Sequence, residues 1–236
     1  MVGIIGAMAV EVEDLLALME EEASETISGT VYHSGRIAGT DCVVAQCGIG
    51  KVAAAVCAQT MILKYRPASV VNVGVAGGIG KDIHIGDVVV SRGLVQHDMD
   101  TSALGDPKGF LSGPNLVEIP ASGPLAETAV TCAGEIVGKE RVHLGVIATG
   151  DQFIGDAGRL EEIARDFGAC ACEMEGGSIA QVCFLNRVPF VVIRAVSDNA
   201  NEEAAVDFGA FAADSAKKSA ALVRRLLAAA QGGDGA

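Results

Sequence analysis

The feature that most constrains the fold of this chain is an alternation of short, β-rich apolar runs with longer segments of helical periodicity. Several of the runs are apolar on both faces, which is typical of strands in a sheet that is covered on both sides. Strands are predicted at residues 2–5, 31–37, 42–46, 70–75, 87–95, 143–148 and 190–196. Helices are predicted at residues 11–22, 52–65, 124–138, 157–167, 176–186 and 208–230. The alternation therefore predicts an α/β fold.

The length and composition favour a single domain. The chain has 236 residues, of which half are hydrophobic, so it can bury a substantial core. Neither a repeat nor a linker divides it, and we expect one domain over residues 1–230 followed by a disordered tail at 231–236. The least regular stretch, residues 98–123, is unusually long for a passive connection, and such loops often cover sites or make subunit contacts.

Charge and hydrophobicity exclude two classes of partner. The net charge is −13 and no cluster of Lys and Arg is present, which argues against binding a nucleic-acid backbone. No apolar run reaches the roughly 18 to 20 residues that cross a bilayer. The N-terminus shows no basic leader of a signal peptide, and most of the seven cysteines lie in apolar stretches. We expect a cytoplasmic protein that binds a small neutral or zwitterionic ligand, with no role for the membrane.

Four segments share one layout, in which an apolar strand runs into glycine or a short polar group. They are residues 3–11, 47–51, 72–78 and 192–198. In an α/β sheet such strand ends meet at one edge, where ligands usually bind. Each glycine turn alone is equally compatible with a simple tight turn. The turn at 47–51 lacks the Gly-Lys-Ser/Thr ending of a Walker loop, so a nucleoside triphosphate is disfavoured.

Several charged residues stand close to these strand ends. Glu173 and Glu175 flank an apolar residue between a predicted strand and a helix start, and capping explains only one of them. Arg194 lies inside an apolar strand, which predicts a carboxylate or a polar cleft nearby. Glu11 and Asp198 also have simpler explanations, as a residue in the first turn of a helix and as a turn or cap residue.

Two further motifs admit a structural explanation. Residues 97–100, His-Asp-Met-Asp, contain metal-binding residue types, but one His on a flexible segment is insufficient for zinc, so we interpret them as a polar loop. Phe153 and Ile154 follow a turn and are either core residues or a wall against which a base stacks.

Taken together, the motifs resemble those of the 5'-methylthioadenosine/S-adenosylhomocysteine nucleosidases, relatives of the purine and uridine phosphorylases. The resemblance covers residues 3 to about 229. It rests on Gly-Ile-Ile-Gly-Ala-Met at 3–8, Gly-Ile-Gly-Lys-Val-Ala-Ala-Ala at 48–55, Ala-Gly-Gly at 76–78, His-Asp at 97–98, Gly-Asp-Gln-Phe-Ile at 150–154, Glu-Met-Glu at 173–175 and Arg-Ala-Val-Ser-Asp at 194–198.

The resemblance implies a three-layer αβα sandwich around a central mixed β-sheet, usually assembled as a homodimer. Residues 98–123 would then contribute to the neighbour's pocket for the 5'-substituent, with Leu104 where relatives often carry Phe. It also implies hydrolysis of the N-glycosidic bond of 5'-methylthioadenosine and S-adenosylhomocysteine, with release of adenine and with neither a metal nor an organic cofactor. Methionine salvage, methyl-cycle detoxification and menaquinone supply all remain open as the main role.

Residue roles follow from the same resemblance. Asp198 matches the general acid at adenine N7, with Ser197 orienting it, and Glu11 matches the base that activates water, helped by Arg194. Glu175 matches the carboxylate that holds the ribose hydroxyls. The remaining matches are apolar or main-chain contacts: Met174 beside the sugar, Phe153 and Ile154 at adenine, and Met8, Ile49 and Phe208 around the ribose and alkylthio end.

One substrate-binding position departs from the family pattern. Relatives commonly have Gly-Ser-Ala-Gly-Gly, whereas this chain has Val75 in place of the Ser. A hydroxyl near the water or the ribose is therefore lost, and the rate or the substrate preference is expected to differ.

Three other functions stay open. A phosphorylase on the same fold would need cations near the sugar, whereas the turn at 6–11 offers a carboxylate and no Arg, which favours water as the nucleophile. Cleavage of 6-amino-6-deoxyfutalosine is a second nucleosidase reaction found in the family. A nucleoside-binding protein without turnover would not need Glu11, Glu175 and Asp198 together.

Overall fold

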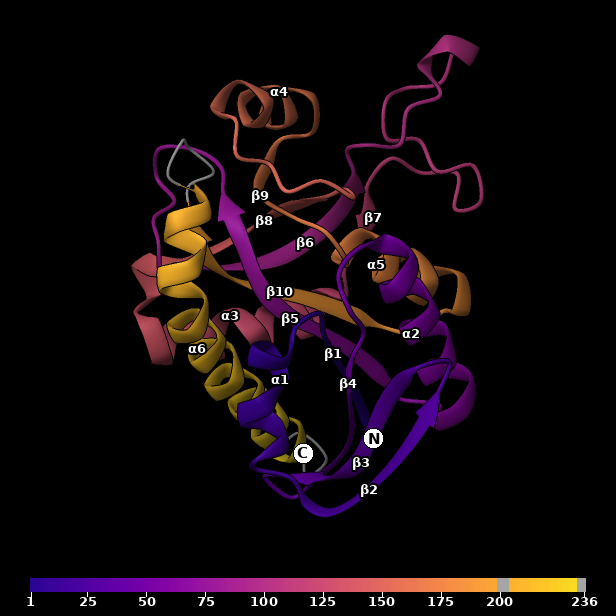
Figure 1. The fold of residues 1–236 in the computed structure, drawn as a ribbon, viewed down its shortest axis with the longest axis vertical. Coiled ribbons are helices and arrows are strands. Elements are labelled where there is room, and N and C mark those ends of the chain that lie inside the picture. Colours follow the sequence, from indigo (N-terminus) through magenta and orange to yellow (C-terminus); the bar gives the residue numbers. More distant parts are fainter. Residues whose placement is uncertain (199–203, 233–236) are drawn as a thin grey trace.

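The computed structural model describes residues 1–198 and 204–232, without the side chains at 204–210, 212–213, 215–216 and 230–232 (Figure 1). The strands are β1 (Val2–Gly6), β2 (Glu20–Ile27), β3 (Thr30–Ile37), β4 (Thr40–Gln46), β5 (Ser69–Gly78), β6 (Val88–Gln96), β7 (Ile119–Pro120), β8 (Val142–Thr149), β9 (Ala169–Glu173) and β10 (Phe190–Asp198). The helices are α1 (Ala9–Leu16), α2 (Lys51–Tyr65), α3 (Gly123–Val137), α4 (Ala157–Phe167), α5 (Gly176–Asn186) and α6 (Ala204–Gly232), with short 3-10 turns at η1 (Ser102–Leu104) and η2 (Lys139–Arg141).

The strands form one mixed sheet, as expected, and their order is β10-β6-β8-β9-β5-β1-β4-β3-β2. Parallel pairs include β1 with β4 and β5, and β8 with β6 and β9. The β2–β3–β4 meander and the β5–β9 and β6–β10 pairs are antiparallel. Strand β10 also pairs with β5, which closes β5, β10, β6, β8 and β9 into a ring and leaves β2 at the open end of the sheet.

Helices cover both sides of this sheet because its central strands are apolar on both faces. Ile4 of β1 packs in one buried cluster, with residues of α1, α3 and α6, whereas its neighbour Ile5 packs in another, with residues of α2 and α5. Helix α4 covers β8 and β9 through a third cluster. The α/β prediction with a helix layer on either side of the sheet is therefore confirmed (Figure 1).

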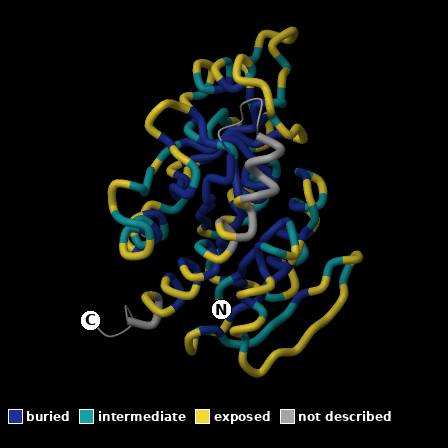
Figure 2. Tube along the Cα trace, turned by 60° about the vertical axis from the view of Figure 1, so that its left-hand side comes forward, coloured by how far each residue is buried: buried dark blue, intermediate teal, exposed yellow. Residues whose placement is uncertain are grey.

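The predicted helix at residues 11–22 is wrong in its second half. Helix α1 ends at Leu16, and residues 20–27 form strand β2. Ser28 and Gly29 follow with φ of 52° and 81°, the left-handed conformation of a tight hairpin turn, so β2 pairs with β3. Strand β2 is exposed along almost its whole length, so no buried stripe marks it in the sequence (Figure 2).

The long irregular stretch that follows β6 projects from the sheet, at the upper right of Figure 1. It contains only η1, the two-residue strand β7 and an isolated bridge between Leu111 and Leu116. At the other end of the chain, α6 runs to Gly232, so residues 231 and 232 of the expected tail are helical and residues 233–236 lie outside the described part. Among the described helices, none is long and apolar enough to cross a membrane.

Candidate active site

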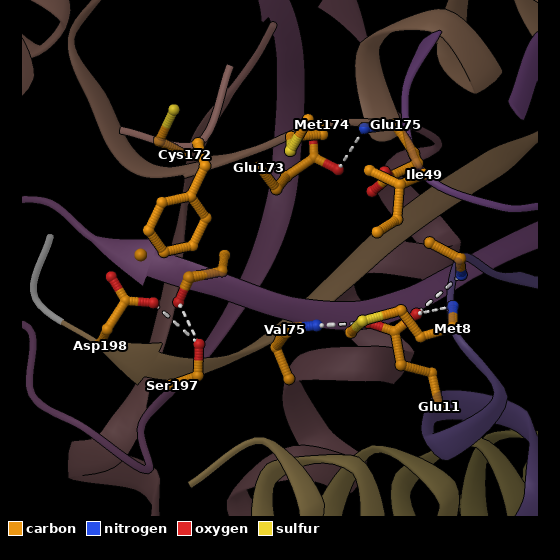
Figure 3. Close-up of a pocket in the computed structure, with 14 residues that line it drawn as sticks. Met8, Glu11, Ile49, Val75, Cys172, Glu173, Met174, Glu175, Ser197 and Asp198 are labelled. Carbon is orange, nitrogen blue, oxygen red and sulfur yellow. Dashed lines mark hydrogen bonds between the residues drawn. The ribbon is translucent and has the colours of Figure 1, made fainter. Parts of the chain in front are cut away.

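A cavity of about 360 Å³ opens where β1, β5, β9 and β10 end (Figure 3). The four glycine-bounded segments that the sequence marks all reach it, and residue 153 joins them from the loop after β8. Its walls are mainly apolar. The lining residues are Ala7, Met8, Glu11, Ile49, Val75, Ala76, Gly77, Phe153, Cys172, Glu173, Met174, Glu175, Ser197 and Asp198.

Glu11 lies buried in the first turn of α1, at one side of the cavity. Its Oε2 accepts hydrogen bonds from the backbone amides of Ala7 (2.7 Å) and Met8 (2.9 Å), and its Oε1 accepts one from the amide of Val75 (3.1 Å). These donors come from the ends of two adjacent strands, β1 and β5. They hold the carboxylate in one orientation next to the cavity.

Arg194 is fully buried at the centre of β10, and it does have carboxylate partners, as predicted. Its Nη2 hydrogen-bonds to Glu173 and to Asn72 Oδ1 (2.7 Å) and lies 3.5 Å from Glu175 Oε2. Burial opposes the charge of Arg194, but Glu173, Glu175 and Glu11 outweigh burial and raise its pKa. The guanidinium therefore remains a fixed cation behind the cavity.

Glu173 and Glu175 are both directed at Arg194, but they have different surroundings. Glu173 accepts hydrogen bonds from the Thr149 hydroxyl and from the amides of Glu175 (3.0 Å) and Gly176 (2.7 Å), besides that of Arg194. This carboxylate is thus saturated by the protein itself. Glu173 anchors the start of α5 and the Arg194 side chain.

Glu175 is held less tightly, by the amide of Gly50, which donates to its Oε1 at 2.9 Å. Burial raises the pKa of this carboxyl to about 7, and the negative charges of Glu173 and Glu11 add to the effect against the opposing influence of Arg194 and the Gly50 amide. A buried carboxyl beside a cavity with so perturbed a pKa is typical of a functional group.

Asp198 lies on the other side of the cavity from Glu11 in the view of Figure 3. It is buried at the end of β10, and the Ser197 hydroxyl donates to its Oδ2 at 3.0 Å. The pairing of β10 with β5 shifts register between Val196 and Asp198. Such irregularities re-aim side chains at strand ends, and here both polar residues line the cavity.

The apolar residues of the predicted site line the same cavity, except two. Met8, Val75 and Met174 are among its walls, and Ile49 and Phe153 stand at its mouth, 62% and 54% exposed. Ile154 lines a small adjoining cavity of about 40 Å³, which Phe153 and Asp198 share. Phe208 belongs to α6, but its side chain lies outside the described residues.

Sequence reasoning missed the residues that support the site from behind. Asn72 is a polar residue inside the apolar strand β5, and its Nδ2 donates to the Ile5 carbonyl (2.8 Å) while its Oδ1 accepts from Arg194. The argument that predicted a partner for Arg194 could have identified Asn72 too. The roles of Thr149 and of the Gly50 amide have no comparable signal in the sequence.

Residues 97–100 form a turn and an irregular segment after β6, in agreement with their interpretation as a loop, but the first two side chains are not exposed. His97 is buried against Gly150, and Asp98 forms a partly buried ion pair with Lys51 at 2.6 Å. These side chains point toward the interior because β6 continues to Gln96 and the chain then turns back over β8. Across the described residues, no three His, Cys, Asp or Glu side chains are grouped to hold a metal ion.

Comparisons with known proteins agree on the family of this chain. The family model described as the phosphorylase superfamily matches residues 1–228. A 5'-methylthioadenosine/S-adenosylhomocysteine nucleosidase from Shewanella oneidensis is 43% identical over 235 residues, which cover 96% of this chain and 95% of that protein. A second nucleosidase of the same name, from Shewanella sp. strain W3-18-1, is 42% identical with 96% and 97% coverage.

Solved structures give the same result. The nucleosidase from Neisseria meningitidis, in complex with methylthio-immucillin-A, superposes with a TM-score of 0.92 at 36% identity and covers 97% of this chain and 98% of that one. A futalosine hydrolase mutant from Helicobacter pylori superposes with a TM-score of 0.90 at 38% identity, with coverage of 96% and 97%. With a family match over nearly the whole chain and relatives above 40% identity, the protein belongs to the phosphorylase superfamily and, within it, to the 5'-methylthioadenosine/S-adenosylhomocysteine nucleosidase family of N-glycosyl hydrolases.

Proposed function

We propose that this protein hydrolyses the N-glycosidic bond of 5'-methylthioadenosine and S-adenosylhomocysteine and releases adenine. The observation that carries the proposal is a single apolar cavity with Asp198 on one side and Glu11 and Glu175 on the other. Breaking this bond leaves negative charge on adenine and positive charge on the sugar. A general acid next to adenine would neutralise the first charge, and carboxylates next to the sugar would stabilise the second.

Asp198 is the general acid in this proposal. It donates a proton to N7 of adenine as the bond breaks, which is the contribution expected of a positioned acid. The Ser197 hydroxyl, 3.0 Å from its Oδ2, fixes the orientation of the carboxyl. Phe153 forms the wall against which adenine stacks, and the Ile154 main chain reads the base edge.

Glu11 is the base that activates the attacking water. Arg194 supports it, since Arg194 Nη1 and Glu11 Oε1 both lie close to Gly74, within 2.0 Å and 2.6 Å of the place where a Cβ would stand. Glu175 holds the ribose hydroxyls with Met174 beside the sugar, and Met8, Ile49 and Phe208 surround the alkylthio end. Val75 supplies only its amide to Glu11, so the hydroxyl common in relatives is replaced by an apolar contact.

Water rather than phosphate is the proposed nucleophile. The described residues that line the cavity include neither Lys nor Arg, and Arg194 behind them is already paired with Glu173. A phosphate dianion would need cationic donors at the sugar. A second substrate, 6-amino-6-deoxyfutalosine, is favoured by one specific observation, the similarity to futalosine hydrolase structures at 38% identity.

The test is adenine release from the three nucleosides in phosphate-free buffer, with Asp198→Asn as the control. We expect release by the wild type, a strong loss in the variant, and relative rates that rank the substrates. Release only after phosphate is added would point to a phosphorylase instead. Nucleoside binding without release under either condition would contradict an enzymatic function.

The assembly we propose is a homodimer through the face that carries α2 and the mouth of the cavity. Val52, Val56 and Leu63 follow one side of α2 and are exposed, and Leu104 on the projecting stretch is 84% exposed. A row of large exposed apolar side chains beside a ligand cavity is typical of an interface. The neighbour's 98–123 stretch would then close the 5' end of the pocket.

The dimer is tested by sedimentation equilibrium of a variant with Val56→Asp. We expect this variant to be a monomer with a raised KM for nucleosides, because the 5' end of its pocket stays open. Leu144→Asp is the matched control, since Leu144 is also an exposed apolar residue but lies on β8. A monomeric wild type, or dimers in both variants, would contradict this interface.

The cell compartment and pathway are part of the same proposal. All seven cysteines are free thiols in the structure, which suits a reducing compartment, and we place the protein in the cytoplasm. Removal of 5'-methylthioadenosine and S-adenosylhomocysteine would connect the enzyme to methionine salvage.

A further inference from the structure

Three segments that are distant in the sequence are tied together beside the mouth of the cavity. Asp98 Oδ1 accepts a hydrogen bond from Lys51 Nζ (2.6 Å), and its Oδ2 accepts one from the amide of Asp151 (2.9 Å). The carboxylate of Asp151 in turn accepts a hydrogen bond from the amide of Lys51 (2.7 Å). The two aspartates and the lysine thus form a closed set of three bonds, which we term the clasp.

The clasp connects directly to the carboxylate at the sugar end of the cavity. Gly50, which precedes Lys51, donates its amide to Glu175 Oε1 at 2.9 Å. Gly50 has a φ of 97°, and a Cβ there would lie 3.0 Å from Asp151 Oδ1, so this turn is pressed closely against Asp151. The hydrogen bond from the Lys51 amide to Asp151 therefore also fixes the direction in which the adjacent Gly50 amide points toward Glu175.

The clasp also spans the two walls at the cavity mouth. Ile49 precedes Gly50, and Phe153 follows Asp151 by two residues. Both side chains line the cavity, and both are more than half exposed, so core packing does little to fix them. The bonds of Asp98 and Asp151 join the two loops on which these side chains stand.

The clasp rests on a rigid base. Asp98 follows His97, which is buried beneath Gly150, where a Cβ would come within 2.4 Å of the imidazole Nε2. Gln96 accepts a hydrogen bond from Lys51 Nζ (3.3 Å) and donates one to Gln181 of α5 (2.8 Å). Burial opposes ionisation of Asp98, but the Lys51 ammonium and the Asp151 amide outweigh it and lower its pKa, so the pair is charged at neutral pH.

We propose that Asp98 and Asp151 are positioning residues that set the separation of the Ile49 and Phe153 walls and hold the Gly50 amide on Glu175. Neither aspartate lines the cavity, so each acts through these neighbours rather than on the ligand. The effect on catalysis rests on the proposed nucleosidase function. The effect on the loop that carries Phe153 does not, and it can be measured separately.

The kinetic test compares Asp151→Ala with Asp151→Asn and Asp156→Ala. We expect Asp151→Ala to raise KM about tenfold and to change kcat by less than about threefold, because positioning of Glu175 and the walls serves ground state and transition state alike. Asp151→Asn keeps an oxygen that can accept from the Lys51 amide, so it should restore KM to near the wild-type value. Asp156 lies on the same loop and accepts a hydrogen bond from the Arg159 amide at 2.8 Å. Asp156→Ala is therefore the control, because it removes a similar hydrogen bond that is not part of the clasp.

The second readout needs no activity. The chain has no Trp, so Phe153→Trp introduces a single fluorescent reporter on the loop. Adding Asp151→Ala should make this Trp more accessible to acrylamide quenching, whereas adding Asp156→Ala should not.

Equal quenching in both double variants, or equal KM changes for Asp151→Ala and Asp156→Ala, would contradict the positioning role proposed for the clasp. Failure of the wild type to release adenine would instead overturn the proposed function, and the quenching comparison would still decide the positioning role.

Discussion

Gly74 of β5 lies at a crowded point of the site, next to both Glu11, the proposed base, and the buried Arg194. A Cβ at this position would come within 2.0 Å of Arg194 Nη1 and 2.6 Å of Glu11 Oε1, both closer than real Cβ contacts. Gly74 is paired with Arg194 of β10, and β1 holds the other side of β5 up to Asn72, so the backbone has little room to retreat. The absence of a side chain here is what allows Glu11 and Arg194 to approach one strand together.

Replacing Gly74 by Ala is therefore expected to displace one of these two groups. We predict a loss of at least about 100-fold in kcat/KM for adenine release, since small misplacements of catalytic groups cost about that much. Gly113→Ala is the control, because nothing lies within 4 Å of a Cβ there. Near-normal activity of Gly74→Ala would show that Glu11 and Arg194 are not both needed in their present positions.

The raised pKa of Glu175 predicts a pH dependence. Burial and neighbouring carboxylates place this pKa at about 7, so the ionised carboxylate that we propose holds the ribose hydroxyls is formed only as pH rises through that value. We expect kcat/KM to increase with pH up to about 7, and this limb should be missing in Glu175→Gln. A wild-type profile that is flat between pH 5 and 7 would contradict the assignment.

Stability should change in the opposite direction. A carboxyl with a raised pKa in the folded state binds its proton more tightly there than in the unfolded chain. Its stabilising contribution is thus complete below its ordinary pKa and is lost as pH rises to about 7. Urea unfolding of wild type and Glu175→Gln at pH 5 and 7 measures this difference.

At the scale of the elements, the ends of α2 and α5 are built in the same unusual way. Each helix is followed by a C-cap arginine with left-handed backbone, Arg66 with φ of 51° and Arg187 with φ of 58°. Most helices that end in this conformation use glycine, because a Cβ is unfavourable there. Both arginines are exposed, so their side chains contribute little packing.

Arg66→Gly and Arg187→Gly should each stabilise the protein, by about 0.5 to 1 kcal/mol, because glycine removes the steric cost of the left-handed conformation. Chemical denaturation measures the gain. Arg92→Gly, at an exposed position within β6, is the control and should destabilise the protein. A loss of stability in the first two variants would mean that the arginine side chains make contacts worth more than the strain.

The elements also show where sequence reasoning succeeds and fails. Strands that are buried on both faces, such as β1 and β10, were predictable because a continuous apolar run has few other uses. Strand β2 was not, since its residues are exposed and only its pairing with β3 makes it a strand. The site residues that border glycine turns could be identified, whereas the support from Thr149 and Gly50 depends on how β8 and the turn before α2 are placed in space.

At the scale of the whole molecule, thiols are distributed through the interior rather than paired. Of the seven cysteines, all but Cys170 are buried, and burial raises the pKa of Cys42 to about 11 and those of Cys172 and Cys183 to about 12. A thiol is reactive only as the thiolate, so these groups are chemically protected in the folded protein.

We therefore expect the native protein to react slowly with a thiol reagent such as dithionitrobenzoate at pH 8, and seven thiols to react rapidly in denaturant. The slow native reaction should be limited by opening of the structure. The measurement is the time course of absorbance in the two conditions. Rapid labelling of several thiols without denaturant would contradict the packing described for the core.

The position of β2 at the open end of the sheet bears on how the protein behaves at high concentration. An outer strand offers unpaired backbone groups to which another chain can add its own strand, and sheet growth of this kind leads to aggregation. Strand β2 carries the exposed acidic side chains of Glu20, Glu21, Glu22 and Glu25, and Glu21 and Glu25 form ion pairs with Arg36 and Lys64. Its pairing with β3 shifts register between Glu20 and Ala23, where Glu21 has a φ of 56°. A second chain would meet a bent border lined with charged side chains, so the part of the sheet most exposed to intermolecular pairing is also the part least suited to it.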